Sequence, residues 1–102
     1  MVIAEFSVVP VGTGTASVGK IVTKAIRTLK RHKKVSYQLT AMGTILEGEL
    51  TDVLAAVADA HESTFVAGVE RVVTRIVIDD RRDKEISAEY KVQSVMKKLG
   101  KK

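Results

Sequence analysis

The fold is decided by the stretch VSYQLTAMGTILEGEL, residues 35–50. Apolar and polar side chains alternate through residues 35–42, which is the pattern of a half-buried strand. Gly43 offers a bend, and residues 44–49 predict a partner strand that is broken at Gly48. We therefore predict two neighbouring strands in the middle of the chain.

Upstream of this pair, residues 2–9 are rich in strand-forming side chains and have apolar residues on both sides. This pattern favours an interior strand over an edge strand. Pro10 has no N–H to donate to a sheet, and a glycine-rich turn follows it at residues 12–15. The first strand is therefore predicted to stop near Val9.

A helix is predicted between this strand and residue 35, from about Ser17 to Arg31, with Thr15 or Ser17 as its cap. Its apolar side chains recur at steps of three and four residues, as Val18, Ile21, Val22, Ala25, Ile26 and Leu29. Lys30 and Arg31 complement the negative end of the helix dipole.

A second helix is predicted to follow residue 50, capped by Thr51 or Asp52 and ending near Phe65. The side chains expected to point inward are Val53, Leu54, Val57, Ala58 and His61. Residues 71–79 alternate again and predict a fourth strand.

A last helix is predicted at about residues 86–99, after a charged loop. The element order β-α-β-β-α-β-α predicts an α+β, ferredoxin-like fold: an antiparallel four-stranded sheet with an extra C-terminal helix. Right-handed crossovers place the first two helices on one face of the sheet. We expect one domain over residues 1–102, with its core at about residues 2–80.

The opposite face of the predicted sheet is left without helices. It is expected to carry a mixture of apolar and hydrogen-bonding side chains, namely Ile3, Ser7, Val9, Gln38, Thr40, Met42, Val73, Arg75 and Val77. Such a face is typical of a subunit interface or a ligand platform. The sequence therefore predicts a homo-oligomer.

The charges divide sharply along the chain, although the net charge is only +5. Residues 6–46 contain seven bases and no acid, whereas residues 35–70 contain six acids and no base. This split suits either a nucleic-acid surface or two neighbouring helices of opposite charge, and the predicted fold puts those helices side by side.

Several function classes lack the residues that they require. The chain has no cysteine, which excludes disulfides, thiolate zinc sites and cysteine nucleophiles. No apolar run is long enough for a membrane span, and residues 1–6 lack the features of a signal peptide, so we expect a cytoplasmic protein.

Nucleotide and nucleic-acid chemistry are weakly supported. Residues 14–20 have the spacing of a phosphate-binding loop, but Ile21 stands where that motif needs Ser or Thr, so weak anion binding at the helix start is the better interpretation. RNA-binding relatives of this topology stack bases on strand aromatics, and no strand here has that aromatic-rich signature.

The two histidines form no catalytic or metal-binding motif. His32 lies in a basic run and is expected to be solvated. His61 has core-facing spacing on the second helix and is expected to be a hydrogen-bonded structural group. We therefore expect no enzymatic activity, no metal and no cofactor.

One polar cluster remains as a candidate ligand site. It comprises Gln38, Thr40, Met42, Thr44 and Glu47, joined to a turn that contains Thr13 and Ser17. Glu47 is notable because a carboxylate within a strand is costly unless it is solvated or paired. It is either a ligand contact or a structural group, such as an edge carboxylate or an interface partner of Arg75.

These same residues resemble a known family. Residues 9–14 with Ser17, residues 37–48, His61, residues 71–74 and the end signature at residues 78–83 are similar to the small thiamine-binding proteins of the YkoF-like group. The resemblance spans about residues 2–85, and its most specific part is the Met-Gly-Thr-x-x-Glu-Gly string at residues 42–48. Ala41 stands where the family more often has proline.

The resemblance implies a ferredoxin-like domain that assembles into dimers and tetramers through its sheets. It also implies binding of thiamine, or its hydroxymethylpyrimidine portion, without catalysis. Glu47 would then pair with the aminopyrimidine ring, Gln38, Thr40, Thr44 and Ser17 would supply hydrogen bonds, and Met42 would cover a ring. The alternatives are a structural or regulatory module that binds another small ligand or an anion and, in third place, an RNA-binding protein.

Overall fold

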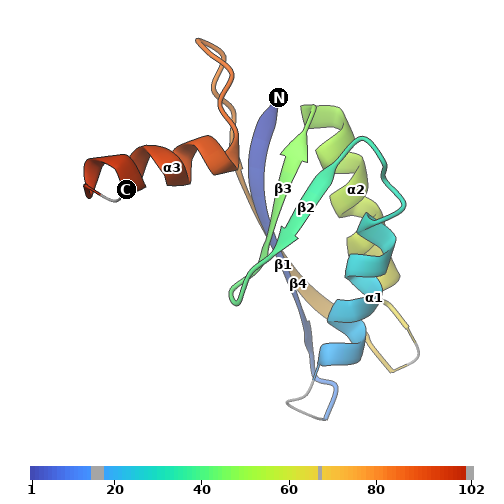
Figure 1. Ribbon diagram of the computed structural model, residues 1–102. Helices are drawn as coiled ribbons and strands as arrows, with labels where there is room; N and C mark the ends of the chain where they lie inside the picture. Colours follow the sequence, from blue (N-terminus) through green and yellow to red (C-terminus); the bar gives the residue numbers. More distant parts are fainter. Residues whose placement is uncertain (15–17, 67, 101–102) are drawn as a thin grey trace.

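The computed structural model describes residues 1–14, 18–66 and 68–100. Its elements are β1 (Val2–Val11), α1 (Gly19–Leu29), β2 (Ser36–Leu39), β3 (Thr44–Gly48), α2 (Leu50–Ser63), β4 (Arg71–Asp79) and α3 (Ala88–Lys98). The strands form one antiparallel sheet in the order β2-β3-β1-β4, and α1 and α2 cover one face of it (Figure 1). The predicted ferredoxin-like fold with an extra C-terminal helix is confirmed.

The core lies between this sheet and the two helices. Alternate residues of β1 point toward the helices, and Phe6, with 1% of its surface exposed, is among the largest buried side chains. Leu46 of β3, Leu29 of α1 and Val53 of α2 complete the centre of the core. The remaining core side chains are mostly Val and Ala, which allows the helices to approach the sheet closely.

β1 continues past the predicted stop at Val9. It runs to Val11, and Pro10 pairs with Val72 of β4. β1 pairs with β3 only as far as Phe6, so the rest of β1 has β4 on one side alone. Proline is tolerated where a strand has an unpaired edge, which is why this strand does not stop at Pro10.

The N-caps of α1 and α2 are Val18 and Glu49. α1 begins at Gly19 with Val18 as its N-cap, and the expected caps Thr15 and Ser17 lie outside the described residues. For α2 the prediction was wrong, because the N-cap is Glu49 and the helix begins at Leu50. The strand leads into this helix with only one intervening residue, so Thr51 and Asp52 already belong to the first turn.

The inward face of α2 is rotated relative to the prediction. Val53 and Val57 are buried as expected, but Leu54 and Ala58 are exposed. Ala56 and Ala60 are buried in their place. Small alanine side chains bring this helix close to its neighbours, a packing requirement that the apolar pattern alone does not reveal.

His32 is not simply solvated, contrary to the prediction. Its Nε2 atom lies 2.7 Å from Oδ2 of Asp59 on α2. The contact joins the end of the basic first helix to the acidic second helix, which lie side by side (Figure 1). The division of charge along the sequence thus has a structural basis within the chain.

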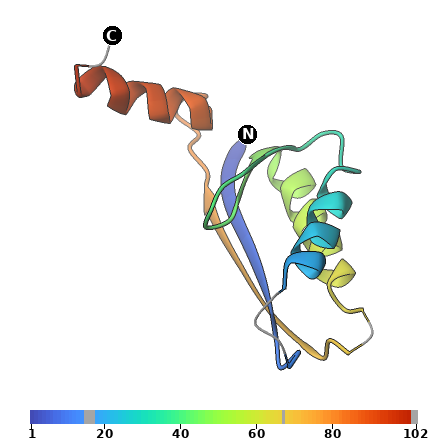
Figure 2. The same ribbon diagram turned by 60° about the horizontal axis from the view of Figure 1, so that its bottom comes forward.

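α3 extends away from the rest of the fold (Figures 1 and 2). Ser87 is its N-cap and accepts a hydrogen bond from the backbone N–H of Tyr90 at 3.0 Å. None of the residues in this helix is buried. In the described ranges, no helix is long and apolar enough to cross a membrane.

Candidate ligand-binding site

The sheet face opposite α1 and α2 has a pocket of about 660 Å³ where it meets the start of α3. We call this face the open face; its residues are the β1 side chains that alternate with the buried ones, and their partners in the other strands. The floor of the pocket includes Ile3, Glu5, Gln38, Thr40, Ile45 and Val77, and its wall includes Asp79, Ala88, Glu89, Lys91 and Val92.

The strand register arranges this part of the open face in two rows across the sheet. Glu5 of β1 lies opposite Ile45 of β3 on one side and Val77 of β4 on the other, and Gln38 of β2 lies opposite Ile45. The next row contains Ser36, Glu47, Ile3 and Asp79. Side chains directly opposite each other in antiparallel strands are in contact distance. The floor therefore combines the apolar side chains of Ile3, Ile45 and Val77 with the carboxylate of Glu5 and the amide of Gln38.

Contacts from the sheet hold the wall of the pocket in place. Glu47 accepts a hydrogen bond at Oε2 from the backbone N–H of Ala88, at 3.2 Å. The ammonium group of Lys91 pairs with the carboxylate of Asp79 at the end of β4. A carboxylate at a helix N-terminus is favoured by the unpaired amides and by the helix dipole. Glu47 and Asp79 thus fix the start of α3 against the sheet.

The pocket is acidic although the protein as a whole is basic. Its lining contains the carboxylates of Glu5, Asp79 and Glu89 and one ammonium group, that of Lys91. The formal charge of the lining is therefore negative, against +5 for the chain. Screening limits the reach of distant charges to about 8–10 Å, so these local carboxylates govern the field inside the pocket. The pocket favours a cationic or electron-poor ligand.

The predicted site residues occupy different parts of the fold. Gln38 and Thr40 line the pocket, and Glu47 borders an adjoining hollow of about 350 Å³. Thr44 points to the core and is 4% exposed, whereas Met42 lies in the β2–β3 turn and is 85% exposed. Neither of these two lines the pocket.

The two other predicted residues belong to the β1–α1 connection. Thr13 follows the far end of β1, at the opposite end of that strand from Ile3 (Figure 1). The structure therefore does not bring Thr13 to the pocket within one chain. Ser17 lies outside the described residues.

The hydroxyl of Thr40 has a local role in addition to its place at the pocket. It donates to the carbonyl of Gly43 at 2.8 Å and accepts from the backbone N–H of Gly43 at 3.1 Å and of Met42 at 3.3 Å. These bonds close the turn between β2 and β3. Thr40 thereby sets the position of this edge of the pocket.

Comparison with known proteins identifies the family. A family model described as thiamine-binding protein matches residues 4–96. The chain belongs to the thiamine-binding protein family. The UPF0045 protein YqgV of Bacillus subtilis is 44% identical over 102 residues, which covers 97% of this chain and 98% of that protein. The resemblance noted from the sequence is therefore confirmed.

Solved structures of similar proteins share the fold. The crystal structure of the hypothetical protein MJ1052 from Methanocaldococcus jannaschii has a TM-score of 0.84 and 41% identity, covering 92% of this chain and 94% of that one. Protein TM0486 from Thermotoga maritima has a TM-score of 0.75 and 21% identity, covering 92% of this chain and 97% of that one. Both solved structures therefore share the ferredoxin-like fold of this chain.

The glycines of the string that pointed to the thiamine-binding family have a packing role. A Cβ atom on Gly48 would lie 3.1 Å from the carbonyl oxygen of Lys34, and one on Gly43 would lie 3.1 Å from that of Phe6. Such contacts are tighter than ordinary packing allows. The glycines of this string therefore allow its backbone to lie close to the backbone of Phe6 and Lys34. Glu47 lies between the two glycines in the sequence.

The sequence reasoning did not single out Glu5, Asp79, Glu89 or Lys91. Glu5 carried the same signal that drew attention to Glu47, namely a carboxylate inside an apolar strand. Asp79 and Lys91 come together only because α3 starts where it does. No local pattern in the sequence predicts that placement.

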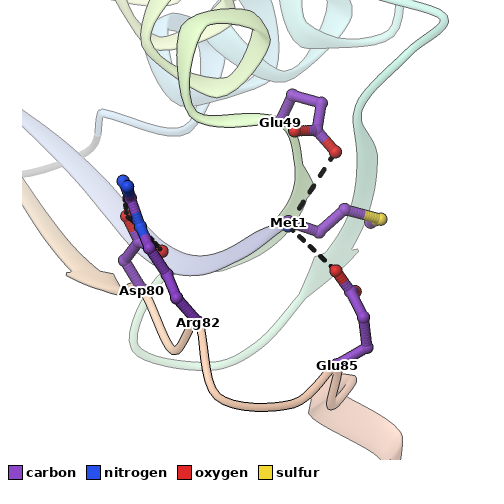
Figure 3. Close-up of polar contacts among 5 residues, drawn as sticks. All are labelled: Met1, Glu49, Asp80, Arg82 and Glu85. Carbon is purple, nitrogen blue, oxygen red and sulfur yellow. Dashed lines mark hydrogen bonds and ion pairs between the residues drawn. The ribbon is translucent and has the colours of Figure 1, made fainter.

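A second group of charges lies beyond the pocket, around the start of β1. Figure 3 shows the Met1 amine beside the carboxylates of Glu49 and Glu85, and Arg82 beside Asp80. The amine lies 3.8 Å from Oε2 of Glu49 and 3.4 Å from Oε1 of Glu85, and Arg82 lies 2.8 Å from Asp80. A hydrogen bond from Arg82 lowers the pKa of Asp80. Because these charges pair with one another, this group makes a weaker ligand site than the acidic pocket.

Proposed function

We propose that this chain binds thiamine, or its hydroxymethylpyrimidine portion, in the pocket on the open face, as a homo-oligomer and without converting the ligand. Membership of the thiamine-binding family supports the class of ligand. The observation that carries the proposal is the row formed by Gln38, Ile45, Glu5 and Val77. It combines a flat apolar surface with a carboxylate and an amide.

The chemistry of thiamine suits this row. Its aminopyrimidine ring is flat and presents nitrogen donors and acceptors, which a carboxylate and an amide bind in complementary fashion. We assign the carboxylate to Glu5 and the amide to Gln38, with Ile45 and Val77 against the ring. Glu47 contributes through its hold on Ala88 and borders the site from the adjoining hollow.

The acidic lining also supports a preference between the forms of the vitamin. Thiamine carries a positive charge on its thiazolium ring, whereas the diphosphate ester adds negative charges. Glu5, Asp79 and Glu89 attract the former and repel the latter. We therefore propose that unphosphorylated thiamine is preferred, even though the net charge of the protein is +5.

Calorimetry tests this proposal. Thiamine, its pyrimidine portion and its diphosphate are titrated into the wild-type protein, into Glu5→Gln, and into the control Glu62→Gln, whose carboxylate lies on α2, away from the pocket. A charge-assisted hydrogen bond contributes about 1.5–3 kcal/mol, so Glu5→Gln should weaken thiamine binding by roughly 10- to 100-fold. The control should bind as the wild type does.

Three results would overturn parts of the proposal. If none of the three ligands produces heat on titration, the proposal that the chain binds thiamine is wrong. Tighter binding of the diphosphate favours an anion site and contradicts the assigned preference. Chromatography of the recovered ligand should return unchanged thiamine, and a converted product would show that the protein is an enzyme.

A further inference from the structure

The outward side of α1 carries a row of basic side chains. Lys20, Lys24, Arg27 and Arg31 follow one another at steps of four, three and four residues, which places them on one side of the helix and of the turn that continues it. All four are exposed. A helix rises about 1.5 Å per residue, so this basic row is about 16 Å long.

The positive charge of the basic row is not neutralised within the described part of the chain. No carboxylate there forms an ion pair with any of its four bases. Asp59 of the acidic helix α2 reaches this region, but its partner is His32. In the loop before α3 and in α3 itself, by contrast, Arg81, Arg82 and Lys91 each pair with an aspartate. The charge of the basic row is therefore available to an anion from outside the chain.

The basic row also works against the stability of its own helix. Lys20 lies in the first turn of α1, where the positive end of the helix dipole disfavours a cation, and that turn contains no acidic residue. Lys20 and Lys24 are four residues apart, as are Arg27 and Arg31, and like charges at this spacing repel each other. The stability of α1 therefore does not explain the row, whereas an anion bound along it relieves both penalties.

A hollow of about 400 Å³ adjoins the end of the basic row, at the turn between α1 and β2. Arg31 belongs to both features. The hollow is also lined by Lys33 and Lys34, and one carboxylate, that of Asp52, lies among them. The formal charge of its lining is therefore positive, opposite to that of the pocket on the open face. The basic row and this basic hollow form one continuous cationic surface.

This cationic surface offers no apolar contact. Within residues 18–36, which the structure describes throughout, no large apolar side chain is exposed. The apolar side of α1 packs into the core, where Ala25 and Leu29 are buried. A protein partner requires an apolar centre in its interface, and a helix bound to a membrane surface inserts apolar side chains. A surface that presents cations alone fits a partner whose own surface is anionic.

The composition of this region favours a double-stranded partner. Residues 7–36 contain no Phe, Tyr or Trp, whereas proteins that hold single-stranded nucleic acids stack the bases on such side chains. Contacts with the phosphates of a duplex need only cationic side chains, and a duplex carries about one charge per 1.7 Å of its axis. A duplex segment as long as the basic row therefore presents about ten phosphate groups.

We infer that the basic row and the basic hollow bind the phosphate backbone of double-stranded nucleic acid, irrespective of its sequence. The pocket on the open face lies on the other side of the sheet from α1 (Figure 1). This surface is therefore separate from the proposed thiamine site, and the inference does not depend on the proposed function.

Fluorescence anisotropy with a labelled DNA duplex of arbitrary sequence tests the inference. Contact with about four to six phosphates gives a slope of about −4 to −5 when the logarithm of the binding constant is plotted against that of the salt concentration. The affinity should therefore fall several hundredfold, roughly, between about 50 and 200 mM salt. No binding at the lower concentration, or binding that salt does not weaken, would overturn the inference.

A triple variant, Lys20→Gln with Lys24→Gln and Arg27→Gln, tests the assigned surface. Each lost phosphate contact reduces the steepness of the salt dependence by about 0.9, so the slope should become shallower by roughly 2 to 3. At about 50 mM salt we expect the affinity for the duplex to fall at least about tenfold. The midpoint temperature of thermal unfolding should not fall, because the substitutions remove repulsion along α1. Loss of the fold would then not account for the loss of binding.

The matched control removes three bases elsewhere, as Lys84→Gln with Lys97→Gln and Lys98→Gln. It has the same net charge as the first triple variant, but its substitutions lie in the loop before α3 and on α3, which extends away from α1 (Figure 2). We expect this control to keep most of the wild-type affinity and salt dependence. Equal losses in the two triple variants would show that net charge and not the basic row is responsible, and would overturn the inference.

Other probes check the assigned partner. An RNA duplex has the same backbone charge, so binding of either duplex supports the inference. A single strand of the same DNA should bind more weakly than the duplex. Tighter binding of the single strand, or binding of anionic phospholipid vesicles by a protein that does not bind the duplex, would overturn the assignment.

Discussion

The carboxylate of Glu47 accepts a hydrogen bond from the backbone N–H of Ala88, 3.2 Å away and 41 residues further along the chain. The contact joins the centre of the sheet to the first residue of α3. It explains how a helix without buried residues keeps a defined direction. It also makes Glu47 a residue that positions the pocket wall.

Removal of this carboxylate should loosen the start of α3. Glu47→Ala leaves the Ala88 amide without its acceptor, and a hydrogen bond to a charged group contributes about 1.5–3 kcal/mol. Hydrogen exchange of the backbone amides of residues 88–91 should therefore become faster by several-fold or more. Glu47→Gln retains an acceptor oxygen, so the same backbone amides should exchange more slowly in this variant than in Glu47→Ala. Equal exchange in the wild type and Glu47→Ala would contradict this role.

The contact between His61 and Thr74 should contribute to stability. Nδ1 of the imidazole lies 2.6 Å from the threonine hydroxyl, which joins α2 to β4 in a partly buried position. Thr74→Val preserves the shape but leaves the imidazole nitrogen unpaired, at an expected cost of about 1–2 kcal/mol in urea unfolding. Thr74→Ser keeps the hydroxyl, so its free energy of unfolding should fall by less than that of Thr74→Val. A loss of stability in Thr74→Ser with none in Thr74→Val would mean that the methyl group matters and the hydrogen bond does not.

The glycine beside Glu47 should not tolerate a side chain. Gly48→Ala places a methyl group 3.1 Å from the Lys34 carbonyl oxygen, a backbone atom that cannot move aside easily. Overpacking of this kind costs about 1–3 kcal/mol. Gly19→Ala is the control, because nothing lies within 4 Å of the added atom and the site starts a helix. The midpoint temperature of thermal unfolding should fall in Gly48→Ala, whereas that of Gly19→Ala should equal or exceed the wild-type value.

The loop before α3 should show a pH response that depends on one arginine. Arg81 donates two hydrogen bonds to Asp83, at 2.5 and 2.9 Å, and this contact lowers the pKa of that carboxyl. The ion pair is therefore present above the ordinary pKa of aspartate and is lost as the pH falls through the lowered value. Carboxyl NMR titration should show a higher pKa in Arg81→Gln, with no change in Arg71→Gln. An unchanged pKa in Arg81→Gln would contradict the pairing.

The sequence was sufficient for the order of the strands, because they alternate strongly, but not for every strand end. The half-buried strand predicted at residues 35–42 is shorter and exposed, since β2 covers only Ser36–Leu39. Residues 71–79 were predicted with the observed bounds, since a clear period-two pattern ends at a run of charges. The burial of Ala56 and Ala60 was missed, because alanine adds little to an apolar pattern and is chosen here for close packing. The His32–Asp59 pair was missed because it depends on how α1 and α2 lie together.

The candidate site was predictable in part. Gln38 and Thr40 could be placed on the open face because residues two apart in a strand share a side. The pairing of Lys91 with Asp79 could not, because it depends on the direction that α3 takes after the loop at residues 80–87. Thr44 was grouped with Glu47 although the two are three positions apart, an odd spacing that puts them on opposite faces of β3.

The position of β1 between β3 and β4 has a consequence for how the protein is made. Ile3 pairs with Asp79, so β1 finds this neighbour only after the elements from α1 to β4 have been synthesised. Contacts between such distant segments form slowly. Until β4 is made, the edge of β1 that faces it has unpaired N–H and C=O groups, and an unpaired strand edge is the place where a wrong strand can add.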